Sequence, residues 1–143
     1  MQNIVAIIPA RGGSKGIPKK NLINFCGKPL ISWTINQALF TKSISTVWVT
    51  SDSEEILNVA KKLGANTISR PKSLSSDTST TESTWKHALK IIEEKIGSVD
   101  MIVGLQPTSP IRESKDIEKA IQIFKKSKSD SLFSATEIGD FYV

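Results

Sequence analysis

The sequence is poor in the residues from which disulfide frameworks, zinc cages and histidine-based active sites are built. It contains one cysteine, Cys26, and one histidine, His87, in 143 residues. A single cysteine forms no internal disulfide and no cysteine-based zinc cage, so we expect Cys26 to be a small buried apolar residue. His87 falls off the apolar stripe of its predicted helix, and we expect it to be solvated rather than catalytic.

Long apolar runs are also missing. No apolar stretch approaches the roughly 18 residues that a membrane-spanning helix needs. Residues 1–3 lead directly into a strand pattern, without the basic segment of a signal peptide. We therefore expect a cytoplasmic protein with no membrane partner. A length of 143 residues, of which 38% are hydrophobic, predicts one globular domain.

Cations outnumber anions, with 19 Lys and Arg against 14 Asp and Glu and a net charge of +5. Such an excess suits an anionic partner. We expect no nucleic-acid partner, because the cations form no single stripe interleaved with aromatic residues. Many of them lie instead on predicted helix faces, as Lys61 and Lys62 do.

Short apolar, β-branched runs alternate with segments of helical period. The runs predict strands at 4–9, 46–50, 67–68, 101–105 and 131–135. Apolar stripes with a period of about 3.6 residues predict helices over 30–39, 56–63, 85–96 and 117–124. Helix ends are also indicated: Ser51 and Glu54 have the spacing of a capping box, Pro29 fits a first turn, and Gly64 can close the second helix.

This alternation predicts an α/β fold, with a mainly parallel sheet that has helices on both faces and right-handed crossovers. Ligands of such sheets bind beyond the carboxyl ends of the strands. The segments after the first, third and fourth predicted strands then share one rim, which brings residues 8–21 near Arg70 and near residues 106–110. The polar connection over 70–83 is long enough to be functional.

Residues 8–21 read IPARGGSKGIPKKN and have the composition of a polyphosphate-binding loop. Glycines let backbone N–H groups approach an anion closely, and Arg and Lys add charge-assisted hydrogen bonds of about 1.5 to 3 kcal/mol each. Two known phosphate loops are excluded. A P-loop needs glycine where Ile17 or Pro18 stands, and the dinucleotide fingerprint needs glycine where Ser14 stands. The alternative is a solvated loop whose charges serve solubility.

The segment resembles the signature of the acylneuraminate cytidylyltransferases, the CMP-sialic acid synthetase family. The resemblance implies a Rossmann-like nucleotidyltransferase fold and transfer of CMP from CTP to the anomeric hydroxyl of a nine-carbon nonulosonic acid, with release of pyrophosphate and a requirement for Mg²⁺. Residues 16–18 resemble the neuraminic and legionaminic enzymes more than the pseudaminic ones. The implied acceptor is therefore N-acetylneuraminate or legionaminate.

The same resemblance assigns roles within this segment. Arg11 and Lys20 match the family's cations on the triphosphate and are the implied catalytic residues, Lys20 by stabilising charge at the reacting phosphorus. The other implied nucleotide contacts here are Ala10, Gly12, Gly13, Ser14 and Asn21. A role as a surface lysine is the alternative for Lys20.

A second stretch of the resemblance begins at Arg70, which is followed by hydroxyl residues at Ser79 and Thr81. It implies that Arg70 contacts the nucleotide and that Ser79 and Thr81 approach its base or ribose. A surface position is the alternative for Arg70. Ser79 also has capping-box spacing to Glu82, so helix capping alone is an alternative for the hydroxyls; capping and ligand contact can coexist at a helix start.

Gln106 ends the fourth predicted strand, before Pro-Thr-Ser-Pro. The resemblance assigns it to binding of the sugar acid, with a purely structural turn as the alternative. In the family, the metal-binding aspartates and the dimerising segment lie beyond Val143. We therefore expect residues 1–143 to be a nucleotidyltransferase domain without that C-terminal segment, with no metal ligand assigned, and a homodimer at full length.

Two other functions stay open. One is a non-catalytic nucleotide-binding fragment, which the missing metal-binding carboxylates favour. The other is a cytidylyltransferase for 3-deoxy-octulosonate, whose opening loop is less similar. No general base is assigned in any of these readings.

Overall fold

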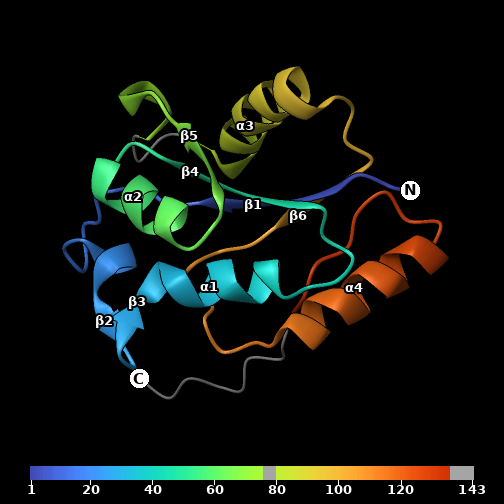
Figure 1. Ribbon diagram of the computed structural model, residues 1–143, viewed down its shortest axis with the longest axis horizontal. Coiled ribbons are helices and arrows are strands. Elements are labelled where there is room, and N and C mark those ends of the chain that lie inside the picture. The colour runs from blue at the N-terminus through green and yellow to red at the C-terminus, as the bar shows by residue number, and fades with distance from the viewer. Residues whose placement is uncertain (76–79, 136–143) are drawn as a thin grey trace, which may run out of the picture.

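The centre of the molecule is a parallel sheet with helices on both sides (Figure 1). The computed structural model describes residues 1–75 and 80–135. In chain order the helices and strands are β1 (Ile4–Pro9), β2 (Asn24–Phe25), β3 (Lys28–Pro29), α1 (Leu30–Leu39), β4 (Thr46–Ser51), α2 (Glu54–Lys62), β5 (Asn66–Ser69), α3 (Thr81–Ile96), β6 (Met101–Gly104) and α4 (Ser114–Lys126). Two 3-10 turns, η1 (Lys20–Leu22) and η2 (Lys72–Leu74), lie in the connections.

The main sheet has four strands in the order β5-β4-β1-β6, and every neighbouring pair is parallel. Ile8 of β1 lies opposite Val49 of β4, and Ile7 lies opposite Gly104 of β6. The carboxyl ends of these strands therefore share one rim. The α/β fold class predicted from the sequence is confirmed, and the strands predicted at 4–9, 46–50, 67–68 and 101–105 agree with the observed bounds to within one residue.

Strand β1 is buried on both faces because its side chains alternate between two cores. Those that face α1, α2 and α4 are Ile4, Ala6 and Ile8, and those that face α3 are Val5 and Ile7. Figure 1 shows α3 on one side of the sheet and α1 and α4 on the other. The central strand is thus held by apolar packing from both layers, which fixes the position of the segment that follows it.

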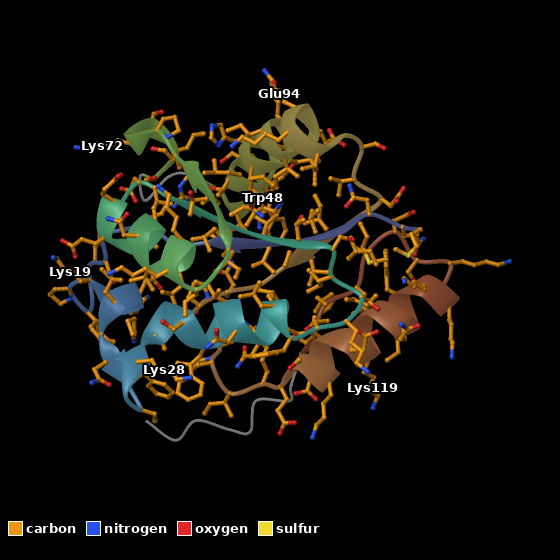
Figure 2. The ribbon with its side chains drawn as sticks, in the orientation of Figure 1. Lys19, Lys28, Trp48, Lys72, Glu94 and Lys119 are labelled. Atoms are coloured by element: carbon orange, nitrogen blue, oxygen red, sulfur yellow. The ribbon has the colours of Figure 1, made fainter. Side chains whose placement is uncertain are left out.

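Trp48 of β4 lies between the sheet and α3, where its side chain is almost fully buried (Figure 2). Charged side chains such as Lys72, Glu94 and Lys119 point away from the body of the molecule. Within residues 1–75 and 80–135, no helix is long and apolar enough to cross a membrane.

Helix α2 has its N-cap two residues after the serine that the sequence predicts. Ser51 is the buried last residue of β4, and its Oγ accepts a hydrogen bond from the backbone N–H of Ser53 at 3.0 Å. Ser53 is the N-cap, and its Oγ accepts from the N–H of Ile56 at 3.5 Å. The prediction was wrong because the strand continues through Ser51. Gly64 does close α2, with φ of +91°, and Pro29 is the N-cap of α1.

The strand predicted at 131–135 is wrong. These residues form no strand, and Phe133 is 85% exposed. A strand needs a neighbouring strand for its backbone groups and a face to bury. Leu132 and Phe133 are one apolar pair between serines, and the structure pairs them with no strand of the described sheet.

The prediction that Cys26 is buried is also wrong. Cys26 and Gly27 form the two-residue turn of the β2–β3 hairpin, with φ of +50° and +89°, and Cys26 is exposed. Positive φ at both positions is the geometry that tight hairpins favour. The Oδ1 of Asn24 steadies the turn by accepting a hydrogen bond from the N–H of Gly27 at 2.8 Å. His87, expected to be solvated, is half-buried in α3.

Candidate functional site

A polar cavity of about 370 Å³ lies at the rim formed by the carboxyl ends of β1, β5 and β6. Its walls come from the segment after β1, from Arg70 and η2, from the first turn of α3, and from the segment after β6. The lining residues are Pro9, Arg11, Gly13, Ser14, Lys20, Asn21, Arg70, Leu74, Ser75, Thr80, Thr81, Thr84, Gln106, Pro107 and Thr108. The three segments that the sequence predicts to meet on one rim do meet here.

The segment after β1, residues 10–20, which we term the opening loop, is held to β4 at its beginning. The N–H of Ala10 donates to the carbonyl of Thr50 at 3.0 Å, and the N–H of Gly12 donates to Oδ1 of Asp52 at 2.9 Å. Asn21, which is 7% exposed, donates from Nδ2 to the carbonyl of Arg11 at 3.1 Å. These bonds fix the backbone of Arg11 and of its two neighbours beside the cavity.

Gly12 is required by close packing against the start of α2. A Cβ built on Gly12 would lie 2.8 Å from the Cβ of Ser53, which is closer than two such carbons approach in folded proteins. The absence of a side chain therefore allows the loop to reach Asp52. Gly12 and Ala10 hold the loop in place, whereas Gly13 and Ser14 line the cavity.

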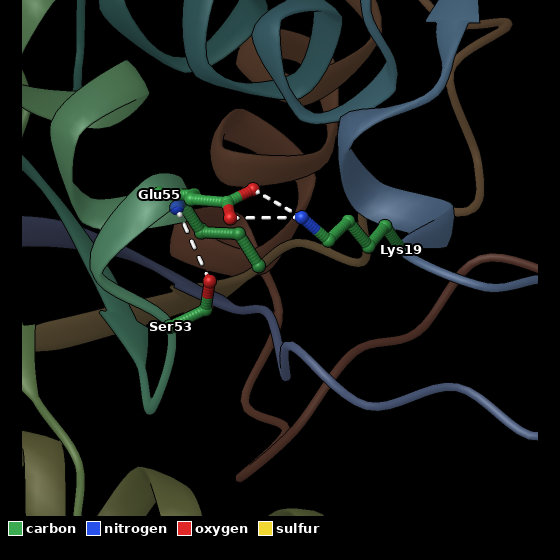
Figure 3. A network of polar contacts seen from close by, with 4 residues as sticks. Lys19, Ser53 and Glu55 are labelled. Atoms are coloured by element: carbon green, nitrogen blue, oxygen red, sulfur yellow. Dashed lines mark hydrogen bonds and ion pairs between the residues drawn. The ribbon is translucent and has the colours of Figure 1, made fainter.

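The opening loop ends at a sharp turn that separates two neighbouring lysines. Lys19 adopts the left-handed conformation with φ of +48°, which is uncommon for a residue with a side chain. Its Nζ lies 2.8 and 2.9 Å from the two carboxylate oxygens of Glu55 on α2 (Figure 3). Lys20 begins η1 and lines the cavity. The turn thus sends one lysine to α2 and the next toward the cavity.

Arg70 is a buried cation in the cavity wall, with only 7% of its surface exposed. Its N–H donates to the carbonyl of Ser51 at 2.8 Å, and its Nη1 donates to Oγ1 of Thr84 at 3.0 Å. Its Nε is buried and has no hydrogen-bond partner in the described part of the chain. Burial lowers the pKa of the Arg70 guanidinium, while the carboxylate of Asp52 raises it and the charge of Arg11 lowers it. The surface alternative for Arg70 is therefore excluded.

The first turn of α3 supplies the hydroxyl wall of the cavity. Thr80 is the N-cap, and its Oγ1 accepts from the N–H of Ser83 at 3.1 Å. Thr81 is the first helical residue and lines the cavity, so it is not the capping residue. Ser79 lies outside the described residues. A helix start presents N–H groups and the positive end of the helix dipole to an anion, which gives this wall the same polarity as the cations of the cavity.

Gln106 is exposed near the start of the segment after β6, and it lines the cavity together with Pro107 and Thr108. We term residues 106–112 the acceptor loop, after the role that the sequence resemblance implies for Gln106. This loop is tied to α1 by Gln37, whose Nε2 donates to the carbonyls of Pro110 at 2.7 Å and Arg112 at 2.8 Å.

The structure brings most of the predicted site residues to the cavity wall. They are Arg11, Gly13, Ser14, Lys20, Asn21, Arg70, Thr81 and Gln106. Sequence reasoning missed Thr84, although it lies one helical turn after Thr80 and therefore shares its face. It also missed Leu74 and Ser75, since a short 3-10 turn leaves no periodic signal. Within the described ranges, no three His, Cys, Asp or Glu side chains gather into a group that could hold a metal ion.

Comparison with known proteins gives one family for nearly the whole chain. A family model described as Cytidylyltransferase matches residues 5–141. The chain is 41% identical over 138 residues to pseudaminic acid cytidylyltransferase of Campylobacter jejuni, covering 96% of this chain and 59% of that protein. It is 39% identical over 122 residues to N-acylneuraminate cytidylyltransferase of Escherichia coli, covering 85% of this chain and 28% of that protein. The chain therefore spans less than two thirds of these relatives.

Solved structures of nucleotidyltransferases have a similar fold. CMP:2-keto-3-deoxy-manno-octonic acid synthetase complexed with CTP superposes with a TM-score of 0.70 at 25% identity, covering 87% of this chain and 48% of that chain. A 4-diphosphocytidyl-2C-methyl-D-erythritol synthase superposes with a TM-score of 0.67 at 11% identity, covering 89% of this chain and 56% of that chain. The second likeness shows the fold alone.

Proposed function

Because the chain belongs to the cytidylyltransferase family, we propose that it binds CTP in the cavity at the tip of β1 and transfers CMP to a nine-carbon nonulosonic acid. Membership of the family agrees with the resemblance carried by residues 8–21. In the proposed reaction the anomeric hydroxyl oxygen of the sugar forms a bond to the α-phosphorus of CTP. The bond from that phosphorus to the bridging oxygen breaks, and pyrophosphate leaves.

The observation that carries the proposal is the convergence of three cations on one cavity. Arg11 and Lys20 come from the opening loop, and Arg70 comes from the end of β5. Three cations beside a helix start form a site for a highly charged anion, because each charge-assisted bond contributes about 1.5 to 3 kcal/mol. The Nε of Arg70 is buried and has no hydrogen-bond partner among the described residues.

We assign the chemistry within this site as follows. Lys20 and Arg11 stabilise the charge that develops on the transferring phosphoryl group, a role in which fixed cations lower the barrier to reaction. Gly13 and Ser14 supply backbone and hydroxyl contacts to the phosphates. Asn21 fixes the carbonyl of Arg11, so its effect on the nucleotide includes holding that residue in place.

The remaining nucleotide contacts are assigned to residues after β5 and at the start of α3. Arg70 and Thr81 would contact the nucleotide, with Ser79 as a further contact from the sequence resemblance. Gln106, which lines the cavity from the segment after β6, is proposed to bind hydroxyls of the sugar acid. The separation of these groups on different segments of the wall supports a two-substrate site.

The acceptor is proposed to be N-acetylneuraminate or legionaminate, on the basis of residues 16–18. Pseudaminate is the acceptor to test beside them, since the identity of 41% to the Campylobacter jejuni pseudaminic acid enzyme is close to the 39% to the Escherichia coli N-acylneuraminate enzyme. A 3-deoxy-octulosonate acceptor is the second candidate, favoured by the superposition on the octonic acid synthetase.

Mg²⁺ is part of the proposal as the ion that accompanies the triphosphate. The described residues provide no cluster of three or more acidic, histidine or cysteine side chains for it, so no step is assigned to a metal held by them. A cytoplasmic location and a homodimer at full length remain predictions from the sequence.

The test is pyrophosphate release from CTP and Mg²⁺ by the 143-residue chain, with each of the four acids as acceptor. We expect release with N-acetylneuraminate or legionaminate and formation of the corresponding CMP-sugar. CTP binding without turnover would support the non-catalytic fragment, and turnover with 3-deoxy-octulosonate alone would support the second candidate. A folded chain that neither binds CTP nor releases pyrophosphate would contradict the proposal.

A further inference from the structure

The acceptor loop, residues 106–112, has few backbone hydrogen bonds of its own to stabilise its conformation. Pro107 and Pro110 have no backbone N–H, and the described backbone–backbone hydrogen bond within the loop is a long one, from the N–H of Ser109 to the carbonyl of Gln106 at 3.3 Å. Ile111 is 93% exposed and adds no apolar anchor. The conformation of the loop therefore depends on contacts with the rest of the molecule.

Arg112 makes the most direct of these contacts. Its Nη2 donates to the carbonyl oxygen of Gln106 at 3.1 Å and to Oγ1 of Thr34 on α1 at 3.1 Å, and its Nε donates to Oε1 of Gln37 at 2.9 Å. The guanidinium thus joins the first residue of the acceptor loop to α1. Arg112 itself is outside the cavity wall, since the described lining on this side is Gln106, Pro107 and Thr108.

Gln37 completes a closed network beneath the loop. The residue is 9% exposed. Both atoms of its side-chain amide form hydrogen bonds: Nε2 donates to the carbonyls of Pro110 and Arg112, and Oε1 accepts from Arg112. Residues at the start, middle and end of the loop are therefore fixed to one helix. Since α1 packs in the sheet core through Ile31 and Ile35, the loop shares the rigidity of the core.

The shape of the Arg112 fork matters more here than its charge. Its three bonds go to a carbonyl, an amide oxygen and a hydroxyl, which are neutral acceptors. Burial lowers the pKa of the Arg112 guanidinium, yet an arginine stays charged in proteins. A lysine would keep the charge but has no planar fork with which to reach Thr34, Gln37 and the Gln106 carbonyl together.

We propose that Arg112 is a positioning residue for the sugar acid: supported by Gln37, it holds the Gln106 end of the acceptor loop in the shape that receives the second substrate. This inference rests on the proposed function. The proposal predicts different effects on the binding of the two substrates. The bonds of Arg112 hold Gln106, and their loss leaves the bonds that hold the opening loop unchanged.

The test is the Arg112→Lys variant, with KM measured separately for CTP and for the preferred sugar acid. We expect KM for the sugar acid to rise roughly tenfold, the effect of losing about 1.4 kcal/mol of positioning, while KM for CTP stays within about twofold. Thr34→Val removes one acceptor of the fork without changing side-chain shape much. It should raise KM for the sugar acid by about threefold, within the range of one hydrogen bond.

A matched control comes from a polar clamp that holds α4 to Ser43, in the connection after α1. Glu118 accepts from the N–H of Ser43 at 2.9 Å and also from the Ser43 hydroxyl, so it docks α4 without touching the acceptor loop. Glu118→Ala should lower Tm and leave both KM values near those of the original protein. If Arg112 only holds the chain before α4 against α1, Arg112→Lys should behave in the same way.

The outcomes separate this inference from the function on which it rests. If the original chain transfers no CMP to any acid, the proposed function fails and the acceptor role of the loop fails with it. If the original chain is active but Arg112→Lys raises both KM values equally, or lowers Tm alone, only the positioning role is overturned. A selective rise in KM for the sugar acid supports it.

Discussion

The opening loop and the acceptor loop leave neighbouring parallel strands on the same rim, yet they are held in different ways. The opening loop is tied at its ends, by the bond from Gly12 to Asp52 and by the ion pair of Lys19 with Glu55, and residues 15–18 between them are exposed. The acceptor loop is tied to the buried Gln37 through the carbonyls of Pro110 and Arg112, and its own Arg112 joins the Gln106 carbonyl to Thr34 on α1. The anchors named for the opening loop lie toward its two ends, whereas those of the acceptor loop join it to one helix.

The difference matches the two ligands that we propose. A triphosphate is long and highly charged, and a loop held mainly at its ends can adjust its cations to it. The ion pair at one of these ends is weak, because its side chains are 65% and 61% exposed and such pairs contribute about 0 to 1 kcal/mol. A sugar acid is recognised by hydroxyl groups in fixed directions, and a loop already in shape loses less conformational entropy on binding.

Lys20→Ala should give the largest effect. Removing one charge-assisted contact that strengthens in the transition state lowers kcat/KM by about 10- to 150-fold. Because a surface substitution changes stability by no more than about 0.5 kcal/mol, Tm should stay unchanged. Steady-state kinetics and thermal unfolding check both parts, with Lys62→Ala on α2 as the control. Unchanged kinetics would remove Lys20 from its assigned role.

Gly12→Ala should weaken CTP binding by about tenfold, equivalent to about 1.4 kcal/mol. The new Cβ would meet the Cβ of Ser53 at 2.8 Å, and overpacking of this kind costs about 1 to 3 kcal/mol. The loop must then move away from Asp52. Gly16→Ala is the matched control, since no atom lies within 4 Å of its added Cβ. Titration calorimetry with CTP should separate the two variants, and equal affinities would contradict the packing role of Gly12.

Gln106→Ala should raise KM for the sugar acid by about 2- to 10-fold, as expected for a neutral hydrogen bond of about 0.5 to 1.5 kcal/mol. KM for CTP should be unchanged, because we propose that this residue contacts the sugar acid and not the nucleotide. Kinetics with each substrate varied in turn provide the check. A rise in KM for CTP instead would indicate that Gln106 contacts the nucleotide, and it would contradict the proposal that this residue binds the sugar acid.

Lys19→Ala should have the smallest effect, a loss of CTP affinity of less than about threefold. The residue points to Glu55 rather than into the cavity, and an exposed pair contributes about 0 to 1 kcal/mol. The same calorimetric titration measures it. A loss as large as that of Lys20→Ala would mean that the opening loop is held much more tightly by its second anchor than this structure indicates.

The sequence predicted the regular core well because burial leaves a clear periodic signal. Strand β1 was predicted at its observed bounds, Ile4–Pro9, since an apolar strand with two packed faces has few alternatives. The meeting of Arg11, Arg70 and Gln106 at one rim also followed, because parallel strands end on the same side.

Features that depend on single turns were not predictable in this way. The β2–β3 hairpin has strands of two residues each, too short to show a period, so Cys26 was placed in the core instead of at the tip of a turn. Ser51 and Ser53 both fit a helix start, and only the length of β4 decides between them. The Arg112 network joins residues more than 70 positions apart, and no local pattern reports such contacts.

The most direct test of the central claim is titration calorimetry of the folded 143-residue chain with CTP in the presence of Mg²⁺. If the cations at the tip of β1 form a triphosphate site, one CTP should bind per chain, and Lys20→Ala should weaken that binding while the fold is retained. A folded protein that releases or absorbs no heat with CTP, or a Lys20→Ala variant that binds CTP as tightly as the original chain, would contradict the claim.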